Sequence, residues 1–267
     1  MIHYDFKGRL QYIPGGALSV QMSAWPAVSG VGTSPGTTNL LAWWSLDETS
    51  GTRQDSHTGN YDMSVAGTPS YTTGKKGNAG TIAVTNGEGS YFYCDDGGAL
   101  DCNAGESITV AGWMYFNSMP SNHGYPITRW GNGGPNTDWA FVVPNNGALT
   151  FSVGRDPSNQ SDAVLSAGTI TSGAWYFFVG IFDHTVGTHG TVYVSANNGT
   201  KGSTALPSAK RVGTVSAVAI GDLSHTAIAY GNMAGAVDEV CVYQRVLTDD
   251  ELAWLYNNGA GRAYSEL

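Results

Sequence analysis

The sequence predicts an all-β protein made of two packed antiparallel sheets, and three observations support this. Nine segments are rich in Val, Ile, Phe, Tyr, Trp and Thr, the residue types that favour strands. Turn-forming pairs such as Asn146-Gly147 and Asn198-Gly199 stand between several of them. No helical pattern alternates with them, as it would in a parallel α/β fold. The predicted strands are Leu40–Leu46, Ser90–Cys94, Ser107–Phe116, Trp139–Val143, Ala148–Val153, Ala174–Phe182, Gly190–Ser195, Val215–Ile220 and Ala236–Tyr243.

One short helix is predicted near the C-terminus. Thr248 and Glu251 have the spacing of a capping box, in which each side chain satisfies a backbone N–H of the other. Leu252 and Leu255 begin an apolar stripe that Tyr256 continues, and the residues Asn-Asn-Gly at 257–259 end the helix. Capping therefore explains the acidic residues 249–251 better than acid/base catalysis does.

Composition excludes several classes of protein. The chain has 267 residues and a net charge of −9, which disfavours nucleic-acid binding because phosphate contacts need a basic surface. The longest strongly apolar run, Ala174–Phe182, is about half of a bilayer span, so no membrane partner is expected. The first residues show no apolar stretch of the kind found in secretory signals. Synthesis in a cytoplasm without a signal peptide is the expectation.

Residues 1–39 differ from the remainder and are expected to form an extended N-terminal arm, followed by one domain over 40–267. The arm is rich in Gly and Pro and has few apolar residues. An unattached leader is one interpretation. The other is a device for attachment or assembly, in which an extended segment pairs with the edge of a neighbouring sheet. The candidate attachment residues are Tyr4, Phe6, Leu10 and Tyr12.

Three cysteines are too few for a disulfide scaffold. Cys94 and Cys102 are close enough in sequence to pair across a short loop, or each is a free thiol. Cys241 lies in a predicted strand and is best explained as a small buried hydrophobic residue.

Four sequence blocks, in order along the chain, resemble the laminin-G-like domains. They are Leu41–Gly51 with Asp55–Asn60, Ile108–Trp113, Ala174–Val179 with Gly190–Val194, and Gly235–Leu252. The resemblance covers about residues 40–260 and implies a concanavalin A-like jelly roll of two curved sheets. Such domains occur in lectins, in carbohydrate-binding modules and in bacteriophage virion proteins, and the opening block is most similar to the phage versions.

Several members of that family bind calcium near the first and last of these blocks. The resemblance implies Ca²⁺ ligands at Asp55, Asn60 and Asp238, with Asp47 as a further contributor, and hard oxygen ligands from loops suit this ion. The alternative is that Asp55 caps a turn and Asp238 accepts backbone hydrogen bonds.

Signatures of enzymes are missing from the sequence. Glycoside hydrolases of this fold carry two glutamates around an aspartate on one strand, and no such pattern occurs here. Asp238 and Glu239 are adjacent, so we expect them to point to opposite faces of a strand. His184 and His189 lie in a glycine-rich turn without a clear third metal ligand. The sequence therefore predicts a protein that is not an enzyme.

Aromatic side chains in or beside loops are candidates for carbohydrate binding, because an aromatic ring can stack on a sugar. They are Tyr125, Trp130, Trp139 and Tyr230. The alternative for each is core packing, which we assign to Trp43, Trp44, Trp113 and Trp175.

Two functions fit these features. The first is a structural component on the surface of a bacteriophage virion, a capsid decoration or tail accessory protein that assembles with other virion proteins or with copies of itself and adheres to glycans. The second is a free carbohydrate-binding module or lectin. A virion protein leaves the cell by lysis and needs no export signal, which favours the first.

Overall fold

The computed structural model describes residues 2–4, 10–12, 32–85, 88–130, 137–155, 159–211, 217–223 and 233–267. The chain divides into two compact units, Met1–Val31 and Gly32–Leu267. In the first unit, β1 (Ile2–Tyr4) pairs antiparallel with β2 (Leu10–Tyr12). Three of the candidate attachment residues lie on this hairpin, and Phe6 lies outside the described residues.

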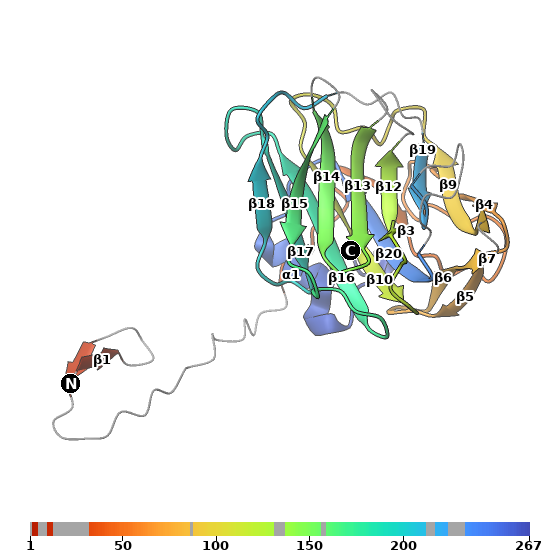
Figure 1. Ribbon diagram of the computed structural model, residues 1–267, viewed down its shortest axis with the longest axis horizontal. Helices are drawn as coiled ribbons and strands as arrows, with labels where there is room; N and C mark the ends of the chain where they lie inside the picture. Colours follow the sequence, from red (N-terminus) through yellow and green to blue (C-terminus); the bar gives the residue numbers. More distant parts are fainter. Residues whose placement is uncertain are drawn as a thin grey trace. The chain divides into compact units, whose positions relative to one another are not determined.

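The second unit is a sandwich of two antiparallel sheets, stacked one behind the other in Figure 1. Among the described residues, the first sheet has the strand order β18 (Gly202–Ala205), β17 (Thr191–Ala196), β16 (Trp175–Asp183), β10 (Ile108–Phe116), β20 (Gly235–Tyr243), β6 (Asn78–Ile82) and β5 (Ser70–Thr73), with β3 (Leu40–Trp44) also pairing with β20. The long central strands β10, β16 and β20 form its framework.

The second sheet lies in front of the first in Figure 1. Its described strands are β15 (Asn159–Leu165), β14 (Leu149–Arg155), β13 (Thr137–Pro144), β12 (Ile127–Trp130), β19 (Ala217–Ile220), β9 (Tyr91–Asp95) and β4 (Ser64–Ala66), with β11 (His123–Gly124) also pairing with β13. β7 (Val84–Thr85) and β8 (Glu88–Gly89) pair with each other in a separate two-stranded sheet. The predicted all-β jelly-roll architecture is confirmed.

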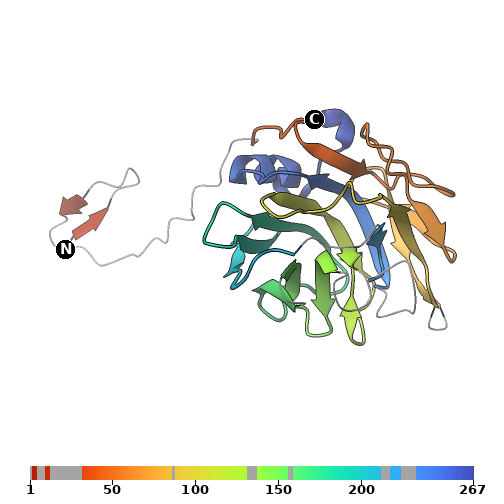
Figure 2. The same cartoon turned by 90° about the horizontal axis from the view of Figure 1, so that it is seen from above.

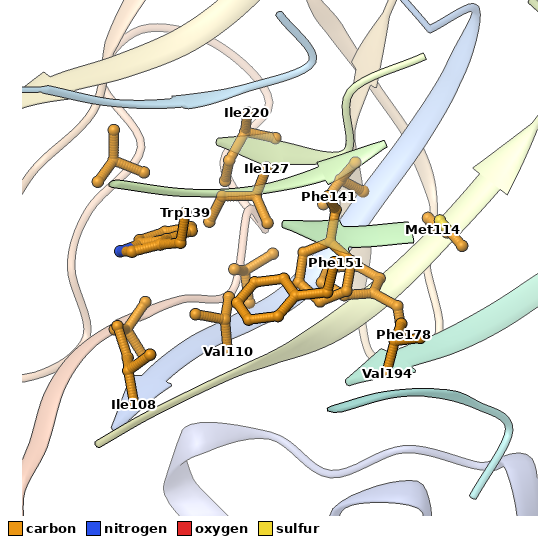
Figure 3. Packing of buried hydrophobic residues seen from close by; sticks show 14 of the residues in the cluster. Ile108, Val110, Met114, Ile127, Trp139, Phe141, Phe151, Phe178, Val194 and Ile220 are labelled. Carbon is orange, nitrogen blue, oxygen red and sulfur yellow. The ribbon is translucent and has the colours of Figure 1, made fainter. Parts of the chain in front are cut away.

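The main core fills the space between the two sheets (Figure 3). Phe141 of β13 is in contact with Phe151 of the same sheet and with Phe178 of the opposite sheet, each at 4.7 Å between ring centres. These rings need room at Gly180 in β16, where a Cβ atom would lie 2.4 Å from Phe151. A glycine in the middle of this strand therefore allows aromatic rings to reach the backbone.

A second apolar cluster lies on the outer face of the first sheet, where helix α1 (Asp249–Tyr256) covers it (Figure 2). The capping box is present, because Thr248 Oγ1 accepts from Glu251 N and Glu251 Oε2 accepts from Thr248 N. Trp43 and Trp113 belong to this cluster. Short 3₁₀ turns, η1 (Asn257–Gly259) and η2 (Tyr264–Glu266), follow the helix. None of the described helices has the length and apolar character needed to cross a membrane.

Residues 32–39, expected from the sequence to belong to the arm, are packed on the sandwich. Arg245 donates to the backbone oxygens of Pro35 and Thr38, and both of its terminal guanidinium nitrogens donate to the carboxylate of Glu251 in α1. Gly32 lies so close to α1 that a Cβ atom there would be 1.8 Å from Asp250 O. These contacts place the start of the second unit at Gly32 rather than at Leu40.

All three cysteines are free and buried in this structure. Burial raises the pKa of the Cys94 thiol to about 12, so this thiol stays protonated. Cys241 is 2% exposed within the outer cluster, as expected for a small buried hydrophobic residue.

A network of charges is buried at the end of the sandwich where β9 and β12 finish. The guanidinium of Arg129 pairs with Asp96 at 3.1 Å, with Asp138 at 3.3 Å and with Asp101. Lys210 adds a second cation, 2.5 Å from Asp138. Burial raises the pKa of Asp101 to about 6, although Arg129 opposes the shift. The buried negative charge of three carboxylates, Asp96, Asp101 and Asp138, is therefore compensated by two described cations, Arg129 and Lys210.

Candidate functional site

The acidic residues of the closing strand lie at a β-bulge. Ala111 and Trp113 of β10 pair with Cys241 and Asp238 of β20, so one residue of β10 faces two of β20. Glu239 takes a left-handed conformation there, with φ of 47°. The expectation that Asp238 and Glu239 point to opposite faces is wrong. Because of the bulge, both reach the outer face, where Asp238 lies opposite Trp113 and Glu239 accepts from the indole of Trp43.

The loop between β5 and β6 wraps around two of the predicted calcium ligands. Asp238 Oδ2 accepts from Lys75 N at 2.6 Å and from Lys76 N at 3.1 Å. Asp47 Oδ1 accepts from Asn78 N at 2.6 Å. The structure thus brings Asp47 and Asp238 to opposite ends of one short loop, residues 74–78.

Two buried carboxylate oxygens in this acidic cluster of Asp47, Asp238 and Glu239 have no hydrogen-bond partner among the described residues. They are Asp238 Oδ1 and Glu239 Oε1. Burial raises the pKa of Asp238 to about 7, and hydrogen bonds from the backbone N–H groups of Lys76, Lys75 and Glu239 oppose this shift. Burial and the nearby Asp238 raise the pKa of Glu239 to about 9. Burial thus favours the protonated forms of both carboxyl groups, and a bound cation would favour the ionised forms instead.

The other two predicted calcium ligands are placed differently. Asp55 accepts backbone N–H groups from Trp43 and His57 on one oxygen and from Tyr61 on the other, at 2.9–3.1 Å. The hydrogen-bonded alternative thus describes Asp55. Asn60 has a left-handed φ of 55° in the same loop. In the described part of the chain, no group of three or more His, Cys, Asp or Glu side chains is arranged to hold a metal ion.

The predicted aromatic surface does not form as expected. Trp139 is fully buried between the sheets, packed as in Figure 3, and its Nε1 donates to Leu100 O; its assignment as a ligand residue is wrong. Its place in β13 gives the physical reason, since odd-numbered positions of this strand face the core. Tyr125 is only 8% exposed, whereas Trp130 is half-buried. Tyr230 lies outside the described residues.

A pocket of about 260 Å³ lies on the outer face of the first sheet. Tyr115 of β10 and Trp175 of β16 are cross-strand partners, with ring centres 5.6 Å apart and planes inclined at 51°. The remaining lining residues are Thr72, Thr73, Thr81, Asn117, Gly235 and Ala236. The pocket therefore combines two partly exposed aromatic rings with hydroxyl and amide groups.

This pocket is not predicted from the sequence, in which Trp175 is expected to pack in the core. The signal that identifies it is alternation: Trp113 and Tyr115 lie on one face of β10, and that face is the outer one. Helix α1 covers Trp113 but leaves Tyr115 half-buried. Helix packing decides which outer-face residues are covered. The sequence of the strand alone does not predict it.

The histidines of the turn after β16 show no metal-binding arrangement. His184 Nδ1 lies 2.9 Å from Ser107 Oγ, and the backbone N–H of His184 donates to the same oxygen. The serine hydroxyl thus anchors the turn.

Comparison with known families agrees with this architecture. The profile described as the concanavalin A-like lectin/glucanases superfamily, of the laminin G type, matches residues 86–253, more than half of the chain. The chain belongs to this superfamily. Among curated proteins, none matches the sequence.

Solved structures with the same concanavalin A-like fold include toxin binding domains. The binding domain of Paraclostridial Mosquitocidal Protein 1 superposes with a TM-score of 0.65 at 14% identity, over 83% of this chain and 52% of that one. The binding domain of Botulinum neurotoxin DC, in complex with rat synaptotagmin II, gives 0.64 at 12% identity, over 82% and 51%. The same domain in complex with SialylT gives 0.63 at 12% identity, over the same shares. This chain thus spans about half the length of these proteins, and the likeness concerns the fold.

Proposed function

We propose that this protein is a lectin-like, non-enzymatic glycan-binding protein. The observation that carries the proposal is the pocket of Tyr115 and Trp175 on a fold shared with lectins. Partly exposed aromatic rings offer a face for a sugar ring, and nearby hydroxyl and amide groups offer hydrogen bonds to its hydroxyls. One toxin binding domain that shares this fold over 51% of its own length has been solved in complex with SialylT.

Glycan binding is tested with the full-length protein on an array of immobilised oligosaccharides. We expect saturable binding to at least one glycan class, displaced by the same sugar free in solution. Retention of no glycan on the array would contradict the proposal, and release of reducing ends from a bound glycan would show that the protein is an enzyme.

We further propose that the protein is a bacteriophage virion component, in which the first unit attaches the sandwich to a capsid or tail. A hairpin of two three-residue strands is too small to be stable alone, so a partner surface would stabilise it. The resemblance of residues 41–60 to phage versions of the fold supports this context. The free carbohydrate-binding module is the alternative.

Deleting residues 1–31 tests this attachment. We expect the truncated protein to lose incorporation into particles or oligomers, while the melting temperature of the sandwich stays within about 2 °C, because contacts of the sandwich begin at Gly32. Density-gradient sedimentation of source material and calorimetry measure the two quantities. Assembly of the truncated protein would show that attachment runs through the sandwich, and a wild-type chain that never sediments with particles would favour the free module.

We also propose that Ca²⁺ binds at the acidic cluster with Asp238 and Asp47 as its two carboxylate ligands, since no group of three acidic side chains is arranged to hold a metal ion among the described residues. The unpaired Oδ1 of Asp238 fits a hard cation, which would complete its shell with backbone oxygens and water. When bound, the ion would neutralise the buried carboxylates and fix the position of the loop formed by residues 74–78.

Calcium removal gives a direct test. EDTA should lower the melting temperature and Ca²⁺ should restore it, because a ligand that binds only the folded state stabilises that state. Asp238→Ala should abolish this response, whereas Asp62→Ala, at an exposed acidic residue outside the cluster, should keep it. An unchanged wild-type melting temperature in EDTA would mean that Asp238 serves only its hydrogen bonds to the loop.

A further inference from the structure

The pocket on the outer face has a chemical character that selects among sugars. None of its described lining residues is charged: the polar side-chain groups are three threonine hydroxyls, the amide of Asn117, the hydroxyl of Tyr115 and the indole N–H of Trp175. Acidic sugars are bound through charge-assisted hydrogen bonds from Arg or Lys, which are stronger than neutral ones. This pocket offers only neutral donors and acceptors.

Two lysines, Lys75 and Lys76, lie in the loop that follows the lining residue Thr73, and both have other partners. The ammonium of Lys75 donates to Gly259 O at 2.7 Å and lies 4.6 Å from the ring centre of Trp113. Lys76 pairs with Glu266 at 2.9 Å. Binding of either lysine to an anion in the pocket would break these contacts. The net charge of −9 on the protein would also repel an acidic sugar.

The size of the pocket limits how much of a glycan it holds. Its volume of about 260 Å³ lies just below the range of about 300–1,000 Å³ that is typical of small-molecule sites. One sugar ring is therefore the unit that enters. Tyr115 and Trp175, inclined at 51°, form two walls of an aromatic corner for the apolar face of that ring.

We infer that the pocket formed by Tyr115, Trp175 and Asn117 binds the terminal residue of an uncharged glycan and discriminates against acidic sugars. The inference rests on the proposed glycan-binding function and adds the site and the ligand class. The threonines of β5 and β6 and the amide of Asn117 would bind the hydroxyls, and the aromatic corner would supply the stacking surface.

Paired ligands test the inference with the full-length protein in titration calorimetry. The neutral probes are lactose, cellobiose and chitobiose, and the acidic probes are sialyllactose and digalacturonate. We expect at least one neutral probe to bind at least about tenfold more tightly than any acidic probe. Equal or tighter binding of an acidic probe would overturn the assignment of ligand class.

Variants locate the site. Trp175→Ala should raise the Kd for the neutral probe at least about tenfold, and so should Asn117→Ala, which changes an exposed residue. Tyr71→Ala removes an exposed aromatic ring on β5 that does not line the pocket, and it should leave binding unchanged. Circular dichroism spectra and melting temperatures check that each variant is folded.

The outcomes separate the inference from the function on which it rests. Glycan binding that survives both pocket changes and is lost in Trp130→Ala would overturn the pocket assignment while the lectin function stands. If no neutral or acidic probe binds and the array is also blank, the lectin function fails and the inference fails with it.

Discussion

Arg129→Ala is expected to lower the free energy of unfolding by about 3–5 kcal/mol. The change removes a fully buried guanidinium and leaves Asp96, Asp101 and Asp138 with Lys210 as their remaining described cation. Removing one partner of a buried ion pair leaves uncompensated charge in a medium that solvates it poorly, which explains a cost of this size. Urea denaturation monitored by tryptophan fluorescence measures it.

The same variant should recover part of its stability as the pH falls from 7 to 5. Burial already raises the pKa of Asp101 to about 6, and loss of the guanidinium raises it further. The folded state then binds more protons than the unfolded state in this interval, so the free energy of unfolding rises as the pH falls. The partly exposed Arg155, at the end of β14 in the same sheet, provides the control, and Arg155→Ala should cost less than about 1 kcal/mol. Equal costs for the two changes would mean that water reaches the network.

Trp139→Ala is expected to destabilise the protein by about 3–5 kcal/mol, because it opens a large cavity between the sheets. The indole is 0% exposed and is surrounded by residues of both sheets, as Figure 3 shows. Its Nε1–H bond to Leu100 O is lost as well.

Trp130→Ala is the matched control, since Trp130 is half-buried at the end of the adjacent strand β12. Its truncation should cost less than half as much as that of Trp139. Chemical denaturation of both variants measures the difference. A small cost at Trp139 would contradict its place in the core and return it to the candidate ligand surface.

Local patterns in the sequence determined much of this fold. All nine predicted strands are present in the structure, with the described part of the eighth beginning at Ala217, and the helix begins at its predicted cap. Turn residues, strand-forming side chains and a capping box act over a few residues, so they can be recognised without knowing the partner strands. The missed strands include β15 and β18, whose sequences NQSDAVL and GSTA carry little strand preference. Those strands depend on pairing with neighbours that are distant in the sequence.

The functional surface, in contrast, was decided by the tertiary structure. The outward direction of both Asp238 and Glu239 follows from a bulge between β10 and β20, which alternation along one strand cannot show. Trp139 and Trp175 both begin or lie near the start of a predicted strand. Trp139 nevertheless packs in the core, whereas Trp175 lines the pocket. The sequence by itself determined that this chain forms an antiparallel sandwich with a capped helix, because those features arise from local interactions. Which rings and carboxylates face solvent was settled only when two sheets and one helix packed together, because burial depends on what covers each face.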